Sequence, residues 1–64
     1  YMLDYTIRLF HPKTKQYSYH VYCNMRETQA LEIAKADHPN TYFCGCWPYI
    51  LDICKVGDDL HSGE

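Results

Sequence analysis

The chain has 64 residues and a formal net charge of −2, with 47% hydrophobic and 16% aromatic residues. A chain of this length buries only about 60% of the surface it exposes when unfolded, which allows one small core and excludes a second domain. No apolar run approaches the roughly 18 residues of a membrane-spanning helix, and the first residues lack the pattern of a signal peptide. We therefore expect a cytoplasmic protein without a membrane partner, whose native chain begins at Met2.

The first two elements are expected to form a β-hairpin. Apolar and polar residues alternate over residues 3–9 and again over residues 16–23, which is the period of a strand. A loop of about five residues, 11–15, separates the two runs and contains Pro12. This alternation places Leu3, Tyr5, Ile7, Leu9, Tyr17, Tyr19 and Val21 against a helix, and leaves Thr6, Arg8, Phe10, Ser18, His20 and Tyr22 on an open face.

A helix is predicted over residues 25–37. Asn24 lies three residues before Glu27, the spacing of a helix-capping pair. His38 precedes Pro39, whose ring disfavours helical geometry in the residue before it and ends the helix. The apolar residues at helical spacing are Met25, Ala30, Leu31, Ile33 and Ala34.

Two apolar runs, residues 42–47 and 49–56, follow the helix on either side of Pro48. Because proline cannot donate to a sheet ladder, they form either one bent strand or two separate pieces, and we favour two pieces. A right-handed crossover through the helix places the third strand beside the first, giving the order 2-1-3. The expected fold is α+β, ββαβ with a possible fourth strand: one helix on a three- or four-stranded antiparallel sheet over residues 1–56, and a polar acidic tail over residues 57–64.

Catalytic and metal chemistry are not expected. The spacing of Cys23, Cys44, Cys46 and Cys54 differs from that of common zinc sites, so free thiols are favoured over a metal site or disulfides. Cys23 and His20 are the nearest nucleophile and base, but residues three apart on a strand point to opposite sides. We expect a protein that is not an enzyme and needs no cofactor.

The aromatic residues, which include seven Tyr, favour a binding function. Tyr, Trp and Arg are enriched at protein interface hot spots, because they bury large, rigid surfaces. A protein partner is favoured, with a second copy of the chain as one candidate. Stacking of single-stranded nucleic acid, with Arg8, Lys13 and Lys15 near phosphates, is the alternative, although the net charge opposes it. The predicted contact residues are Arg8, Phe10, His20, Tyr22, Trp47 and Tyr49.

The chain resembles many small phage and prophage accessory proteins in its layout. This layout is a short hairpin, one helix ending in Ala34-Lys35-Ala36-Asp37-His38-Pro39 and a final strand. Some of these, such as anti-CRISPR proteins, block host defence complexes by binding them. The resemblance covers residues 3–54, lies in size and element order, and assigns no functional residue. It implies a compact inhibitor or adaptor that acts by occupying a surface in the cytoplasm of a host cell.

Overall fold

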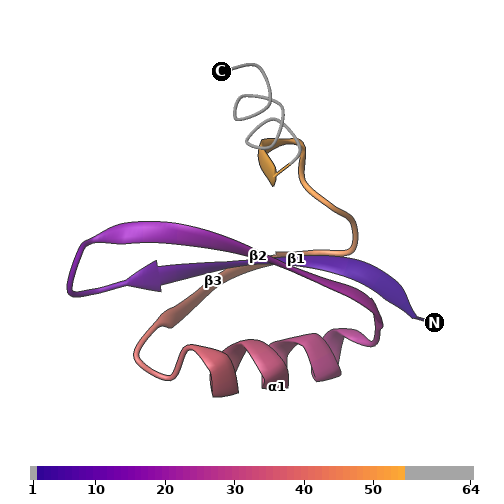
Figure 1. Ribbon diagram of the computed structural model, residues 1–64, viewed down its shortest axis with the longest axis horizontal. Helices are drawn as coiled ribbons and strands as arrows, with labels where there is room; N and C mark the ends of the chain where they lie inside the picture. Colours follow the sequence, from indigo (N-terminus) through magenta and orange to yellow (C-terminus); the bar gives the residue numbers. More distant parts are fainter. Residues whose placement is uncertain (1, 55–64) are drawn as a thin grey trace.

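The computed structural model describes residues 2–54 and contains three strands and one long helix. The elements in chain order are β1 (Leu3–His11), β2 (Gln16–Met25), α1 (Glu27–Asp37) and β3 (Tyr42–Trp47). Strand β1 lies in the middle and pairs antiparallel with both neighbours, in the order β2-β1-β3. The expected α+β class and sheet order are confirmed (Figure 1). The predicted acidic tail at 57–64 lies outside the described residues.

The core lies between the central strand and α1. Tyr5, Ile7 and Leu9 of β1 are buried on one face of the sheet, and α1 contributes Ala30 and Ala34. These two alanines allow the helix backbone to approach the sheet closely, which suits a chain too short for a thick core. Partly buried side chains complete the layer: Tyr22, Met25, Leu31 and Cys46.

The hairpin register differs from the expected one by one residue. His11 pairs with Gln16, so the loop comprises four residues, 12–15, rather than five. Lys15 closes this loop in a left-handed conformation (φ 58°), and its N–H donates to the carbonyl oxygen of His11 over 2.7 Å. A one-residue slip moves every side chain of a strand to the other face. Consequently Ser18, His20 and Tyr22 lie on the helix side, whereas Tyr17, Tyr19 and Val21 lie on the open side.

The helix begins later than its apolar pattern predicts. Strand β2 continues to Met25, which pairs with Leu3, and Arg26 is the residue before the first turn, without a side-chain cap. Asn24 does not cap the helix. It adopts a left-handed conformation (φ 56°) at an irregularity of the β1–β2 register, where its N–H donates to the Asp4 carboxylate over 2.9 Å. Pairing with β1 thus extends the strand over residues that the apolar spacing assigned to the helix.

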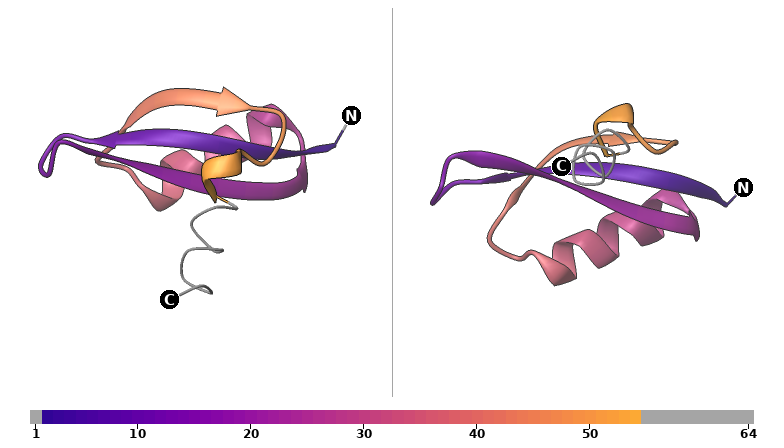
Figure 2. Two further views of the ribbon diagram at one scale, coloured as in Figure 1. Left: turned by 90° about the horizontal axis from the view of Figure 1, so that it is seen from above. Right: turned by 45° about the horizontal axis from the view of Figure 1, so that its top comes forward.

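The chain after β3 crosses the sheet face opposite α1. We call residues 48–54 the strap. Figures 1 and 2 show the strap on one side of the sheet and α1 on the other. The part of the predicted fourth strand that the structure describes, residues 49–54, contains no strand: residues 52–54 are helical, and the Cys54 N–H donates to the carbonyl oxygen of Leu51. The two-piece interpretation is therefore correct in separating the runs at Pro48, but wrong about the second piece.

Candidate functional site

The face of the sheet opposite α1 carries three rows of side chains, each crossing all three strands. Cross-strand partners point to the same side of a sheet, so the two registers define the rows. From the hairpin end they are Tyr17, Phe10 and Tyr42; then Tyr19, Arg8 and Gly45; then Val21, Thr6 and Trp47. We call Arg8, Phe10, Tyr17, Tyr19, Tyr42 and Trp47 the aromatic face.

The row at the hairpin end is the most accessible part of the aromatic face. Tyr17 is 56% exposed and Tyr42 is 64% exposed, while Phe10 between them is half-buried. The rings of Phe10 and Tyr17 are tilted by 57° with centroids 5.2 Å apart, which is a favourable aromatic arrangement. The row offers apolar area together with phenol hydroxyls that can make hydrogen bonds to a partner.

Arg8 lies in the middle of the face between two rings. The centre of its guanidinium is 5.2 Å from the centroid of the Tyr17 ring and 5.4 Å from that of Trp47, within cation–π range. One terminal NH₂ donates to the carbonyl oxygen of Cys44 over 3.1 Å. Hydrogen bonding to the Tyr19 side chain is the main cause of a raised Arg8 pKa, partly opposed by desolvation. These contacts position the guanidinium, which is charged at all physiological pH values, between the two rings.

Trp47 reaches Arg8 because Gly45 leaves room for its ring. Gly45 lies next to a register irregularity in β3 and has a φ of 156°. A Cβ atom at this position would lie 2.9 Å from Cη2 of Trp47. The indole therefore lies against the backbone of its own strand, where only glycine leaves enough space.

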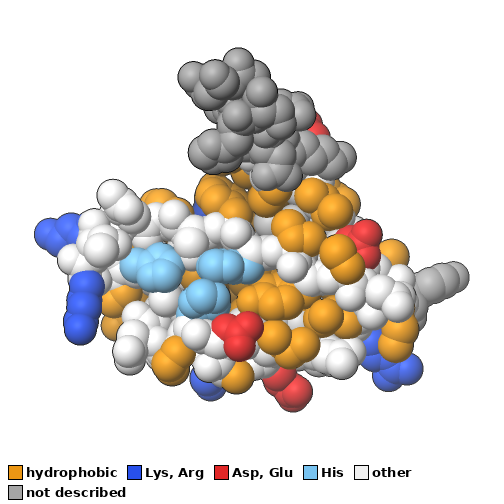
Figure 3. All heavy atoms as spheres, viewed as in Figure 1, with side chains coloured by type: hydrophobic (Ala, Val, Ile, Leu, Met, Phe, Trp, Pro, Cys, Tyr) orange, Lys and Arg blue, Asp and Glu red, His pale blue; other side chains and the backbone are white. Residues whose placement is uncertain are grey.

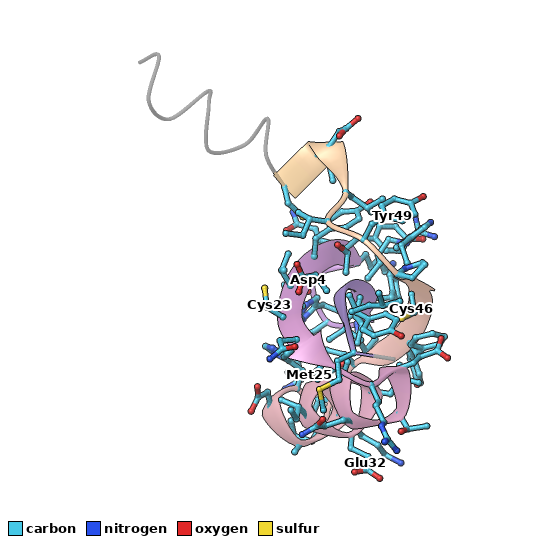
Figure 4. All side chains as sticks on the ribbon, turned by 90° about the vertical axis from the view of Figure 1, so that its right-hand side faces the viewer. Asp4, Cys23, Met25, Glu32, Cys46 and Tyr49 are labelled. Atoms are coloured by element: carbon cyan, nitrogen blue, oxygen red, sulfur yellow. The ribbon has the colours of Figure 1, made fainter. Side chains whose placement is uncertain are left out.

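The strap covers Thr6 in the third row of the sheet face and leaves Val21, in the same row, 37% exposed. Thr6 is fully buried, and its hydroxyl donates to the carbonyl oxygen of Tyr49 over 2.8 Å. The same hydroxyl accepts a hydrogen bond from the N–H of Leu51 over 3.1 Å. The strap thus satisfies the only buried polar side chain in the described core while leaving Tyr49 itself 55% exposed. Figure 4 shows Tyr49 on the far side of the sheet from α1.

Charges differ between the two ends of this face. Lys13 and Lys15 are exposed in the hairpin loop next to the Phe10 row. Asp4 is exposed near the opposite end of β1, and Asp52 is exposed on the strap. A partner that lies across the rings would therefore meet positive charge at the hairpin end and negative charge at the strap end.

The structure brings together part of the predicted contact set. Arg8, Phe10 and Trp47 lie on the aromatic face, and Tyr49 lies beside them on the strap. His20 and Tyr22 do not lie on this face. They lie on the helix side because of the four-residue hairpin loop. Burial and the nearby Asp37 carboxylate raise the pKa of Tyr22.

Three residues of the aromatic face were missing from the predicted contact set: Tyr17, Tyr19 and Tyr42. The first two were assigned to the core because the loop was counted as five residues. Their position on the open face follows from the shorter loop, whose local sequence is Pro12-Lys13-Thr14-Lys15. Tyr42 belongs to a strand whose register depends on the irregularity beside Gly45, which no alternation pattern reveals.

All four cysteines are free thiols, and only Cys23 is exposed. Burial is the main cause of the raised pKa of Cys46, and Glu27 adds to it. In residues 2–54, no group of three or more His, Cys, Asp or Glu side chains is arranged to hold a metal ion. No helix in this part of the chain is long and apolar enough to span a membrane.

A hollow of about 340 Å³ lies on the other side of the sheet, between α1 and β3. Leu9, Leu31 and Ala34 form its apolar floor, and Phe43 is at its rim, 57% exposed. Phe43 points to the helix side, as does its partner Leu9. Adjacent residues Tyr42 and Phe43 thus present two exposed rings on opposite faces of one strand.

Comparison of the chain with known protein families, sequences and structures identified no similar protein. No protein-family model matches the chain, and no curated protein or solved structure shows significant similarity to it.

Proposed function

We propose that the chain is a small, non-catalytic protein-binding module whose contact surface is the aromatic face together with Tyr49. The observation that carries the proposal is the exposed row of Tyr17 and Tyr42 beside an Arg8 guanidinium held between two rings. Such rigid aromatic and Arg side chains supply most of the binding energy in protein interfaces. The Phe10–Tyr17 ring pair and the Arg8 guanidinium between the Tyr17 and Trp47 rings restrict these side chains before binding, which reduces the entropy lost.

The partner surface that fits this face is apolar at its centre and acidic opposite the hairpin loop. Lys13 and Lys15 are exposed there and supply the complementary positive charge. The proposal includes an inhibitor or adaptor role in the cytoplasm of a host cell, as in the phage accessory proteins that the chain resembles. A second copy of the chain is an alternative occupant, for which the thermal midpoint would rise with protein concentration.

Single-stranded nucleic acid is the second candidate ligand, favoured by the row of rings next to Lys13 and Lys15. Aromatic rings on an open sheet stack bases, and nearby cations contact phosphates. The charge of the described residues weighs against it, because five Lys and Arg are matched by five Asp and Glu. Salt separates the two candidates: affinity for nucleic acid falls steeply between about 50 and 200 mM salt.

The experiment is an affinity capture from host lysate, with and without nuclease, using three versions of the chain. The wild type is compared with Tyr42→Ser on the aromatic face and with Phe43→Ser, the adjacent exposed ring on the helix side. We expect one stoichiometric protein that survives nuclease, is lost with Tyr42→Ser and is retained with Phe43→Ser. Loss with Phe43→Ser alone would move the contact surface to the hollow beside α1. Recovery of nucleic acid only would replace the proposal by the stacking function.

A further inference from the structure

Three histidine side chains from three separate parts of the chain meet between the sheet and the end of α1. His11 comes from β1, His20 from β2, and His38 follows the last residue of α1. The rings of His20 and His38 have centroids 4.2 Å apart at an interplanar angle of 33°, and those of His11 and His38 are 6.4 Å apart and nearly perpendicular. We call these residues, with Ser18, the histidine cluster. Figure 3 shows the histidine side chains gathered at the surface beside a hydrophobic patch.

Ser18 joins two of the rings. Its Oγ lies 2.6 Å from Nε2 of His11 and 2.7 Å from Nε2 of His20. A hydroxyl has one proton, so with both rings neutral it donates to one Nε2 and accepts from the N–H of the other. When both rings are protonated, both Nε2 atoms donate to Oγ, and the hydroxyl proton loses its imidazole acceptor. Ser18 therefore stays bonded to both rings when both are charged, but it then holds two like charges close together, and these repel each other.

The charges around the cluster do not compensate three protons. On α1, Asp37 faces His20 and favours its charged form, whereas Lys35 lines the hollow beside His38. On the hairpin loop, Lys13 lies with His11 and His38 around a second hollow. One carboxylate thus faces three imidazoles and two ammonium groups. The single carboxylate can balance the charge of one protonated ring. Protonation of a second or third ring places like charges next to each other, because the ring centroids are only 4.2 to 6.4 Å apart.

We infer that the histidine cluster is a proton-operated latch, which holds the C-terminal end of α1 against β2 at neutral pH and releases it on acidification. The latch is a contact between imidazoles that is stable only when they are largely uncharged. It acts on a segment that leads directly into the sheet: the hydroxyl of Thr41 donates to the carbonyl oxygen of His38 over 2.7 Å, and Tyr42 follows as the first residue of β3. Release of His38 should therefore alter the backbone at the start of β3, where Tyr42 lies.

The lowered pKa of His20 agrees with this geometry. Desolvation is its largest cause, followed by the charges of His38 and His11, while Asp37 acts in the opposite direction. The ring is thus held in the neutral form that the stacked contact with His38 requires. The inference does not depend on the proposed binding function, because it concerns the opposite side of the sheet and is tested on the free protein.

The test is an NMR titration of the histidine ring protons in the isolated full chain, with His38→Gln and Glu32→Gln as variant and control. Glu32 is exposed on α1 and lies outside the cluster. In the wild type we expect contacts between the rings of His20 and His38 at neutral pH that are lost on acidification, together with a shift of the Tyr42 amide. The titration midpoint of His20 should rise in His38→Gln and stay unchanged in Glu32→Gln.

Two results would overturn the latch: ring contacts that persist after all three imidazoles have been protonated, or a His20 midpoint that is the same in His38→Gln as in the wild type. If His38→Gln does not fold, His11→Gln provides the same comparison, because it removes a different charge facing His20. Ser18→Ala is a further readout, since it removes the hydroxyl that joins His11 and His20 without removing an imidazole. In this variant the His20 midpoint should still rise on His11→Gln, because the charge of His11 acts on His20 through space and not through the hydroxyl.

Discussion

The hydroxyl of Thr6 donates a hydrogen bond to the carbonyl oxygen of Tyr49 and accepts one from the N–H of Leu51. A single buried side chain at the centre of β1 therefore attaches the strap to the sheet. Thr6→Val keeps the shape of the side chain but leaves both strap groups without their partner. We expect a loss of about 1–3 kcal/mol in the free energy of unfolding, which is the usual cost of an unsatisfied buried polar group. Urea unfolding measures this loss.

Thr14 provides the control for this change. It is exposed in the hairpin loop, so Thr14→Val should leave the free energy of unfolding within about 0.5 kcal/mol of the wild-type value. Equal stability of Thr6→Val and the wild type would mean that the strap makes no contribution through this hydroxyl.

The sequence predicts the backbone arrangement better than the faces of the strands. Period-two alternation, one amphipathic helix and the right-handed crossover rule lead to the observed order β2-β1-β3. Burial of Tyr5, Ile7 and Leu9 also follows from their alternation. The side chains of β2 were assigned to the wrong faces because its more apolar set, Tyr17, Tyr19 and Val21, was placed against the helix, whereas the structure turns the more polar set toward α1. The register then depends on one residue of loop length, which turn chemistry determines and alternation does not.

The histidine cluster and the strap were missed for a different reason. His11, His20 and His38 come from three elements, and each lies in a local sequence that suggests only a loop or a strand. Their meeting depends on the β2 register and on where α1 ends. The apolar run in residues 49–56 likewise suggests a strand, yet both neighbours of β1 are already present, and the N–H of Leu51 donates instead to the Thr6 hydroxyl. Tertiary contacts therefore override the local pattern at both places.

Gly45 controls the position of the Trp47 ring. In Gly45→Ala the new Cβ would lie 2.9 Å from Cη2 of Trp47, at a φ of 156° that alanine rarely adopts. We expect the indole to move away from Arg8, with a loss of about 1–3 kcal/mol from strain and lost contacts. Trp47 is the only tryptophan, so its fluorescence spectrum reports the movement directly. An unchanged spectrum with unchanged stability would show that the ring does not lie over Gly45.

The thiols of Cys23 and Cys46 should differ in reactivity. Cys23 is exposed near the end of β2, whereas Cys46 packs against the core, and its pKa is raised by burial and by Glu27 (Figure 4). Because the thiolate is the reacting species, iodoacetamide at neutral pH should modify Cys23 well before Cys46. Peptide mass spectrometry over a time course measures both rates. Glu27→Gln should accelerate modification of Cys46 and leave the rate at Cys23 unchanged; equal rates at the two thiols in the wild type would contradict the buried position of Cys46.

Acidification should destabilise the fold through the histidine cluster. The pKa of His20 in the folded chain lies below its ordinary value of 6.5, so the unfolded chain binds this proton more readily. The corresponding stability is fully present above pH 6.5 and is lost as the pH falls toward the folded pKa. Urea unfolding between about pH 8 and pH 5 measures the effect in the range where imidazoles titrate. In His38→Gln the fall should be smaller, because one of the charges that oppose protonation of His20 is gone, whereas a wild-type stability that is flat over this range would exclude any contribution from the cluster.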